Sequence, residues 1–396
     1  MEHYKESPLG LIPKDWEIRK LGELLNVNTG AKNAQDATSN GEFPFFTRSV
    51  NTQRINSFSH DTEALLIAGE GIFKVKHYSG KFDVHQRTYV LTAKDKLNSS
   101  LKFLQNQIQS RIIKLIDTSV GSTVQSLRKP IIQELKLVIP PLVEQLRIAE
   151  ILSTVDDKIE IIDQQIIENQ ELKKALMQRL LTKGIGHTEF KDSALGMIPK
   201  SWEVMKLSKI CDVRDGTHDS PKYLEKGIPF VTSKNLTDTV LSFDNIKYIS
   251  NKDHSNFSKR SHVENGDILF GMIGTVGKPI IVQEKFEFSI KNVALLKFSG
   301  NQLLNNVFAK NILKSSVVLN QFKKISNGGV LNFIALGSIR NLDFPLPSKT
   351  EQQKIAEILN SVDDKLEVLL EKKTHYQELK QGLMQQLLTG KIRVKV

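Results

Sequence analysis

Cysteine is almost absent from this chain: Cys211 is the single one among 396 residues. One thiol excludes an internal disulfide and a cysteine-based zinc site, so we expect a reducing compartment. No apolar run approaches the roughly 18 residues that a membrane span requires. The polar start, Met1–Lys5, also lacks the apolar core of a signal peptide. The sequence therefore predicts a soluble cytoplasmic protein with no membrane partner.

Motifs of the common catalytic sites are also missing. The segment Gly271–Lys278 resembles a phosphate-binding loop, but Met272 and Pro279 stand where that motif needs glycine and Ser or Thr. The nine histidines contain no pair at metal-ligand spacing, and the chain has neither a Gly-x-Ser-x-Gly nor an Asn-Pro-Pro-Tyr motif. We expect no catalytic residue, no metal site and no cofactor held by this chain.

What the chain does contain is an internal repeat. Ser7–Leu21 returns as Ser193–Leu207, with Trp16 and Trp202, the two tryptophans, at matching places. Arg147–Glu160 returns as Lys354–Glu367. The offset is 186 residues at the first match and 207 at the second, so the second copy is 21 residues longer. Two versions of one module, with constant edges and divergent middles, suit the recognition of two different things at a fixed separation.

A long helix is predicted at the end of each copy. Residues 144–182 lack Gly and Pro and carry apolar residues that alternate by four and three, which is a coiled-coil heptad. Prolines stand just before both helices, and Gly184 and Gly390 follow them as stop signals. The seam residues that we expect to hold the coiled coil or a partner are Ile148, Leu152, Val155, Ile159, Ile162, Ile355, Leu359, Val362, Leu366 and Leu369.

Polar residues in the seam bear on the direction of pairing. If the helices paired in parallel, Lys173 would meet Lys380 in one layer and the like charges would repel. An antiparallel pair places each lysine opposite the apolar first half of the other helix, which favours that arrangement. A stagger could also rescue the parallel form, and each helix could instead cap its own module. The pairs Asp156-Asp157 and Asp363-Asp364 are of a kind found in nucleases, but their place on the long helices favours exposed helix faces.

Positive charge is concentrated outside the helices. The net charge is +11, whereas residues 144–182 and 351–389 together hold 10 basic and 15 acidic residues. The helices therefore carry −5 and the remainder +16. A basic surplus in the modules favours a polyanionic partner there.

Within the modules the hydrophobic pattern is short and alternating. Strands are predicted at 43–47, 64–68 and 88–91, and in the second copy at 228–232, 267–270, 279–282 and 292–296, with helical patches near 97–115 and 303–322. The expected fold class is α+β: two repeated α/β modules separated by two long antiparallel coiled-coil helices, with pseudo-twofold symmetry. The expected division is 1–141, first module; 142–183, first helix; 184–346, second module; 347–392, second helix.

Loops that bound the strands are rich in side chains that can pair with base edges or stack on bases. Any one of these residues could equally be an ordinary solvated surface residue, so the prediction rests on the set. In the first module the candidates are Arg48, Asn51, Arg54, Lys74, Lys76, Tyr78, Lys81, Gln86 and Arg87. In the second they are Thr217, His218, Lys234, Asn235, Arg260, Lys278, Lys291 and Asn292.

The duplicated Gly-x-Ile-Pro-x-x-Trp segment and the Gln-x-x-Ile-Ala-Glu-Ile-Leu-x-x-Val-Asp-Asp-Lys helix resemble the specificity subunit of Type I restriction–modification systems. Gly266–Leu269, Gly274–Gly277 and Asp215–Pro221 are also similar to segments of this family. The first copy departs from the pattern at 61–65 and 69–74. The resemblance implies a non-catalytic DNA-binding subunit whose two target recognition domains each read one half of an asymmetric, bipartite sequence.

Partners also follow from the resemblance. The paired helices would act as a spacer that docks two methyltransferase subunits, which supply S-adenosylmethionine chemistry. A motor–nuclease (restriction) subunit would supply ATP- and Mg²⁺-dependent translocation and cleavage. The alternative is a coiled-coil adaptor that joins two protein-binding modules and binds no DNA. A fragment of a fused methyltransferase–nuclease would need catalytic motifs that this chain lacks.

Overall fold

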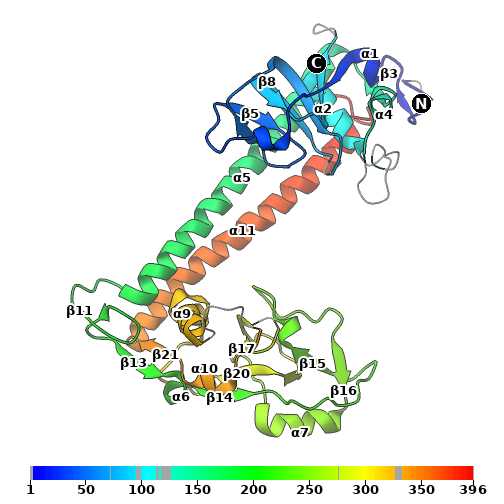
Figure 1. Cartoon of the computed structure of the whole chain (residues 1–396). Helices are drawn as coiled ribbons and strands as arrows, with labels where there is room; N and C mark the ends of the chain where they lie inside the picture. Colours follow the sequence, from blue (N-terminus) through cyan, green and yellow to red (C-terminus); the bar gives the residue numbers. More distant parts are fainter. Residues whose placement is uncertain are drawn as a thin grey trace. The chain divides into compact units, whose positions relative to one another are not determined.

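The computed structural model describes residues 3–71, 73–94, 100–112, 116, 126–274, 276–325 and 332–395. The chain divides into two compact units, each holding one module and the adjoining parts of both long helices (Figure 1). Unit 1 comprises Met1–Gln164 and Leu370–Val396, and unit 2 comprises Gln165–Leu369. Below, module 1 means residues 1–141 and module 2 means residues 184–346.

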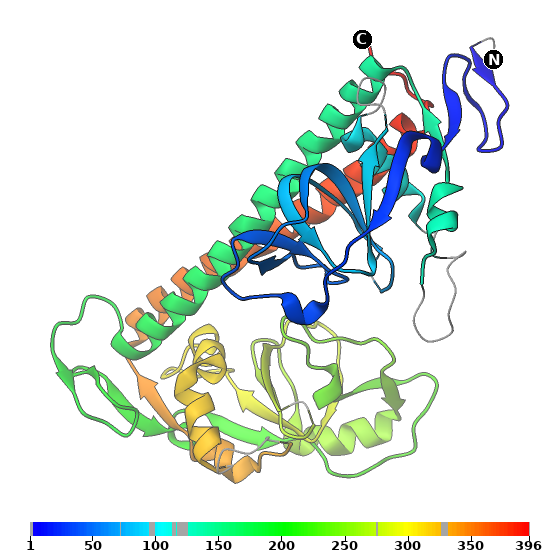
Figure 2. The ribbon, with the colours of Figure 1, turned by 45° about the horizontal axis from the view of Figure 1, so that its top comes forward.

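Module 1 is built on one six-stranded sheet, whose curl is visible in Figure 2. Strand β5 pairs with β8 in parallel, and the other neighbours are antiparallel. In order across the sheet, the strands are β4 (Leu25–Thr29), β9 (Thr88–Ala93), β7 (His60–Ala68), β8 (Val75–Val84), β5 (Phe43–Phe46) and β6 (Gln53–Ile55). The three strands predicted in this module are confirmed.

Module 2 splits the same arrangement into two sheets. The single strand β8 of module 1 corresponds to two shorter strands, β18 and β19, separated by residues 282–288. One sheet has the order β14 (Asp212–Asp215), β20 (Val293–Lys297), β17 (Ile268–Gly271), β18 (Gly277–Ile281). The other has the order β16 (Lys247–Ile249), β15 (Ile228–Thr232), β19 (Ser289–Lys291). The four strands predicted in this module are also confirmed.

Helices cover one side of each sheet. The first helical patch contains α2 (Leu101–Ser110), while residues 97–99 and 113–115 of that prediction lie outside the described residues. The second patch forms two helices, α8 (Asn306–Lys314) and α9 (Ser316–Ile325), which break at Ser315. The other helices outside the two long ones are α1 (Leu21–Leu24), α4 (Lys129–Gln133), α6 (Leu207–Ile210), α7 (Asn251–Ser261), α10 (Leu336–Arg340), η1 (Ala34–Asp36) and η2 (Ser233–Asn235). Helix α7 lies between β16 and β17, whereas only four residues separate β6 from β7, so α7 accounts for part of the longer second copy.

Short strand pairs frame each module in the same way. The constant segments at the two edges of each repeat pair with each other, which closes the module beside its long helix. These pairs are β3 (Glu17–Lys20) with β10 (Lys136–Ile139), and β13 (Glu203–Lys206) with β21 (Asp343–Leu346). A second set comprises β1 (Tyr4–Lys5) with β2 (Ile12–Pro13), and β11 (Phe190–Lys191) with β12 (Ile198–Pro199).

The long helices are α5 (Leu142–Lys183) and α11 (Lys349–Leu387), and they lie side by side and antiparallel within each unit (Figures 1 and 2). In unit 1, Lys380 pairs with Asp156 at 2.6 Å and Lys373 with Asp163 at 2.6 Å. In unit 2, Lys173 pairs with Asp363. The antiparallel prediction is confirmed.

The seam lysines are therefore matched by carboxylates rather than simply turned outward. Lys380–Asp156 and Lys173–Asp363 occupy equivalent positions of the repeat, as pseudo-twofold symmetry predicts. Because these side chains remain partly exposed, each pair adds at most about 1 kcal/mol to stability. Their larger effect is on direction, since a parallel pairing would place lysine against lysine. The first Asp of each Asp-Asp-Lys motif thus contacts the partner helix, and only the second aspartate lies on an exposed face.

A glutamate joins the start of each long helix to a tryptophan, and it is buried in unit 1 and half-buried in unit 2. Trp16 Nε1 donates a hydrogen bond to Glu144 Oε2 at 2.9 Å, and Trp202 Nε1 donates to Glu351 Oε2 at 3.0 Å. Arg393, from the segment after α11, reaches the same Glu144 at 2.7 Å. Both tryptophans are fully buried, so this is the junction between module and helix in each unit.

The residues that follow each helix come close to that junction. Gly184 and Gly390 have φ of +64° and +71°, and the stop signals predicted there are confirmed. A side chain on Gly184 would meet Trp202, and one on Gly390 would meet Pro13. The Tyr4 hydroxyl donates to the Gly390 carbonyl at 3.0 Å, so the N- and C-terminal segments meet in unit 1.

Replacing Glu144 by alanine should destabilise unit 1 by about 3 kcal/mol, because Trp16 loses its buried acceptor and Arg393 keeps only its second carboxylate partner, Asp15. Glu144→Gln should cost less, since the amide oxygen still accepts from Trp16. Urea unfolding followed by tryptophan fluorescence measures both variants. The matched control is Glu150→Ala on the exposed face of α5, which should change the unfolding free energy by less than about 0.5 kcal/mol. Equal costs at the two positions would contradict the assigned role of Glu144.

Cys211 is buried in module 2, and this burial raises the pKa of its thiol to about 12. Among the residues that the model describes, none of the helices is long and apolar enough to cross a membrane.

Candidate nucleic-acid interface

Two of the predicted DNA-contacting arginines in module 1 meet at one carboxylate. Arg48 follows β5 and Arg87 precedes β9, and Glu70 follows β7. Glu70 Oε2 accepts from Arg48 Nη1 at 2.9 Å, and the other oxygen accepts from Arg87 Nη1. The Glu70 side chain is 13% exposed, against 48% for Arg48 and 58% for Arg87. The carboxylate therefore lies beneath two guanidinium groups that still face solvent.

Glu70 remains charged over the working pH range. Burial raises its pKa, but the hydrogen bonds from Arg48 and Arg87 outweigh that effect, so its pKa lies below the ordinary value of 4.5. A carboxyl whose pKa is depressed in the folded state keeps its ion pairs above its unfolded pKa and loses them only as pH falls through the lowered value. Both arginines are therefore held in place at neutral pH.

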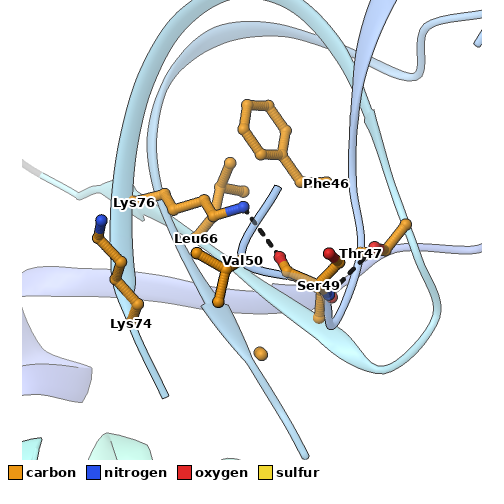
Figure 3. Close-up of a pocket in the computed structure, with 9 residues that line it drawn as sticks. Phe46, Thr47, Ser49, Val50, Leu66, Lys74 and Lys76 are labelled. Carbon is orange, nitrogen blue, oxygen red and sulfur yellow. Dashed lines mark hydrogen bonds between the residues drawn. The ribbon is translucent and has the colours of Figure 1, made fainter. Parts of the chain in front are cut away.

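Lys74, just before β8, and Lys76, on β8, differ in their exposure (Figure 3). Lys76 is turned inward: its ammonium donates to the Ser49 carbonyl at 3.1 Å and lies 5.7 Å from the centre of the Phe46 ring. Burial and then the charge of Lys74 lower the pKa of Lys76. Lys74 is exposed at the rim of the same small pocket. Lys74 is thus the better placed of the two to contact a phosphate.

Other candidates in module 1 have structural roles of their own. Arg54 donates to the carbonyls of Gly41 and Glu42, at 2.9 and 2.7 Å, and so holds the loop before β5. Tyr78 packs on the rings of Phe46 and Phe82. The remaining candidates are exposed: Asn51, Gln86, which donates to Asn33, and Lys81, which lies over the Phe58 ring.

In module 2 a buried aspartate gathers three predicted residues. Asp215 Oδ1 pairs with Arg260 from α7, and Asp215 Oδ2 lies 3.1 Å from His218 Nε2. The other ring nitrogen of His218 lies 2.6 Å from Asn292 Oδ1. The Asp215 side chain is 6% exposed, whereas those of Arg260 and His218 are each 62% exposed. Asn292 has a φ of +53°, a left-handed conformation that asparagine adopts more readily than most residues.

A cavity of about 430 Å³ lies beside this cluster. Four predicted residues line it: Lys234, Asn235, Lys291 and Asn292. Tyr223 and Phe230 supply its aromatic surface, and the ammonium of Lys247 lies 4.2 Å from the centre of the Tyr223 ring. A concave site with aromatic faces, lysines and amides can stack a base and bind its phosphate.

The other module 2 candidates contribute less directly. The Asn235 side chain is engaged with Thr232 and with the Ser242 carbonyl, so it shapes the cavity wall. Thr217 accepts from the Asp219 amide, and Lys278 pairs with Asp238 at 3.1 Å. Lys278 is not among the residues that line the cavity.

Four important residues were not predicted from the sequence. Glu70 and Asp215 are acidic, whereas the prediction considered side chains that bind bases or phosphates. Tyr223 and Lys247 come together only when the chain folds. An acidic residue next to a turn glycine, as in Gly69-Glu-Gly71 and Asp215-Gly216, is a local signal that could have indicated the first two, and Asp215 also begins the family-like segment Asp215–Pro221. In the described ranges there is no group of three His, Cys, Asp or Glu side chains that could hold a metal ion.

Most of the predicted heptad residues are buried within the protein and do not face solvent. Eight of the ten candidates are buried and two, Ile159 and Leu366, are half-buried. Ile148 and Leu152 belong to the core of unit 1, and Ile355 and Leu359 to that of unit 2. A partner that binds the helices would therefore contact other positions. Exposed apolar residues recur in both copies at Ile161 and Val368, and at Leu172 and Leu379.

With this geometry in place, comparison with known proteins identifies the family. The model of the Type I restriction modification DNA specificity domain matches the chain twice, over residues 13–171 and 199–381. Because these matches cover most of the sequence, the chain belongs to the family of Type I restriction–modification specificity subunits.

Known specificity subunits match either the whole chain or about half of it. The Type I restriction enzyme MjaVIII specificity subunit of Methanocaldococcus jannaschii is 28% identical over 413 residues, covering 100% of this chain and 97% of its own. The EcoDI specificity subunit of Escherichia coli is 30% identical over 227 residues, covering 52% and 50%. The crystal structure of a Type I S subunit from M. genitalium matches with a TM-score of 0.66 at 19% identity, covering 94% of this chain and 96% of that one, which shows a shared fold. The adaptor alternative is not favoured.

Proposed function

We propose that this chain reads an asymmetric, bipartite DNA sequence with one module for each half and directs partner subunits that perform the chemistry. The observation that carries the proposal is the pair of exposed polar clusters, one in each module, built from different residues around a largely buried carboxylate. Module 1 presents Arg48 and Arg87, and module 2 presents Arg260, His218 and Asn292. Different side chains on a repeated frame imply different half-sequences.

The division of labour follows the repeat. Residues 1–141 and 184–346 act as target recognition domains, and residues 142–183 and 347–392 act as spacer helices. The seventeen candidate residues form the reading surfaces, with the exposed ones as first choices for contact with bases or phosphates. S-adenosylmethionine, ATP and Mg²⁺ belong to the partner subunits, and the chain by itself is non-catalytic and works in the cytoplasm.

The two methyltransferase subunits dock on the helices. Ile161 and Val368 are exposed and equivalent in the repeat, and so are Leu172 and Leu379. Each of these residues precedes a seam position by one, so it flanks the seam. Recurrence in both copies is what two identical partners require, because each partner must meet the same surface. The restriction subunits join through this assembly.

The test combines binding and methylation. The purified chain should bind duplex DNA with an affinity that falls steeply with salt, and it should transfer no methyl group by itself. With its methyltransferase subunits, genome-wide mapping of methylated sites should give one bipartite sequence. Ile161→Asp with Val368→Asp should prevent co-purification of those subunits while leaving DNA binding intact. Binding that does not depend on salt, or methyl transfer by the chain alone, would contradict the proposal.

A further inference from the structure

Each module holds one largely buried carboxylate beneath exposed polar side chains that contact it. Glu70 accepts from Arg48 and Arg87, and Asp215 pairs with Arg260 and His218. The two acids are not equivalent in the repeat, since Asp215 ends β14 and Glu70 follows β7. The same arrangement has therefore been built twice from different positions, which points to a shared requirement.

A carboxylate is an unexpected neighbour for DNA. Like the DNA phosphates it is negatively charged, so it repels them and weakens binding to DNA of any sequence. Its benefit lies in orientation: arginine has five N–H donors, and a carboxylate that takes one of them leaves the others free. A guanidinium held from beneath is already aligned before DNA arrives, so little side-chain freedom is lost when it pairs with O6 and N7 of guanine.

The positions of the side chains that each carboxylate contacts support this role in orientation. In module 1 the arginines come from the loops after β5 and before β9, and Glu70 joins them. In module 2 Asp215 links α7 to the loop after β14, and His218 extends the link to Asn292. Each acid therefore sets the positions of side chains from separate parts of the sequence.

We propose that Glu70 and Asp215 are positioning residues for specificity: each aligns the base-reading side chains of its own module and thereby sharpens the reading of one half-sequence. This inference rests on the proposed function and adds to it a prediction about two acids that do not themselves contact DNA.

The experiment uses the full chain assembled with its methyltransferase subunits. Glu70→Gln should lower the preference for the specific over the non-specific sequence by about tenfold, which corresponds to about 1.4 kcal/mol. The relaxed positions should all lie in the half-sequence read by module 1. Asp215→Asn should do the same for the other half. Binding to non-specific DNA should not fall, because the arginines remain and a negative charge has been removed.

Matched controls are available on the same strands. Glu63→Gln on β7 removes an exposed partner of His77, and Asp212→Asn on β14 removes an exposed partner of Arg214. Both should leave the methylated sequence unchanged. If Asp215→Asn does not fold, Arg260→Lys can be used instead. This variant keeps the positive charge but loses the planar guanidinium with its paired N–H donors, and it should relax the same half-sequence. Arg87→Lys serves in the same way for module 1.

The outcomes separate the two claims. Relaxation confined to one half, with non-specific binding retained, supports the inference. Unchanged specificity, or an equal loss of specific and non-specific binding, overturns it and leaves the proposed function standing. If the unaltered complex reads no bipartite sequence, the proposed function fails and this inference fails with it.

Discussion

Replacing residues 25–127 with the matching segment of another specificity subunit should change one half of the recognised sequence completely and leave the other half unchanged. This segment runs from the start of β4 to the backbone bond between Leu127 and Gly69, and it contains the whole six-stranded sheet and α2. The constant frame, with β3, α4, β10 and the Trp16–Glu144 junction, stays in place. The new sheet therefore brings its own reading loops to an unchanged support.

Methylation-site mapping of the assembled complex measures this result. The reciprocal control exchanges residues 211–334, the equivalent segment of module 2, and should change the other half alone. Simultaneous change of both halves by either exchange would show that the modules do not read independently.

Lengthening both helices together should alter only the number of unspecified bases between the half-sequences. Seven residues inserted after Gln164 in α5 and seven after Leu369 in α11 add one heptad to each helix, so the seam keeps its phase. Each insertion adds about 10 Å at 1.5 Å per residue, or about three base pairs at 3.4 Å. The pair Asp163–Lys373 remains on one side of the insertions and Lys173–Asp363 on the other.

The control for this double insertion is a seven-residue insertion in α5 alone. It shifts one helix against the other and breaks the match between seam lysines and aspartates, so assembly with the partner subunits should weaken. Site mapping of the matched variant should show both half-sequences unchanged and a longer spacer. An unchanged spacer with altered half-sequences would show that the helices do not set the distance.

The sequence by itself determined the repeat, seven of the strands and the long helices, and it favoured the antiparallel direction of these helices. These features depend on local periodicity and on like-charge repulsion between Lys173 and Lys380, both of which can be read along the chain. The duplicated motifs also determined the family.

Only the tertiary structure decided which side chains act together. Folding brings Glu70 between Arg48 and Arg87, and Tyr223 beside Lys247, although nothing in the spacing of these residues predicts their contact. It also turned Lys76 inward and committed Arg54 and Asn235 to loop contacts, so equal residue types received different roles. The physical reason is that a reading surface is made of loops from separate strands, and their distances depend on how the sheet curls and packs rather than on any local pattern.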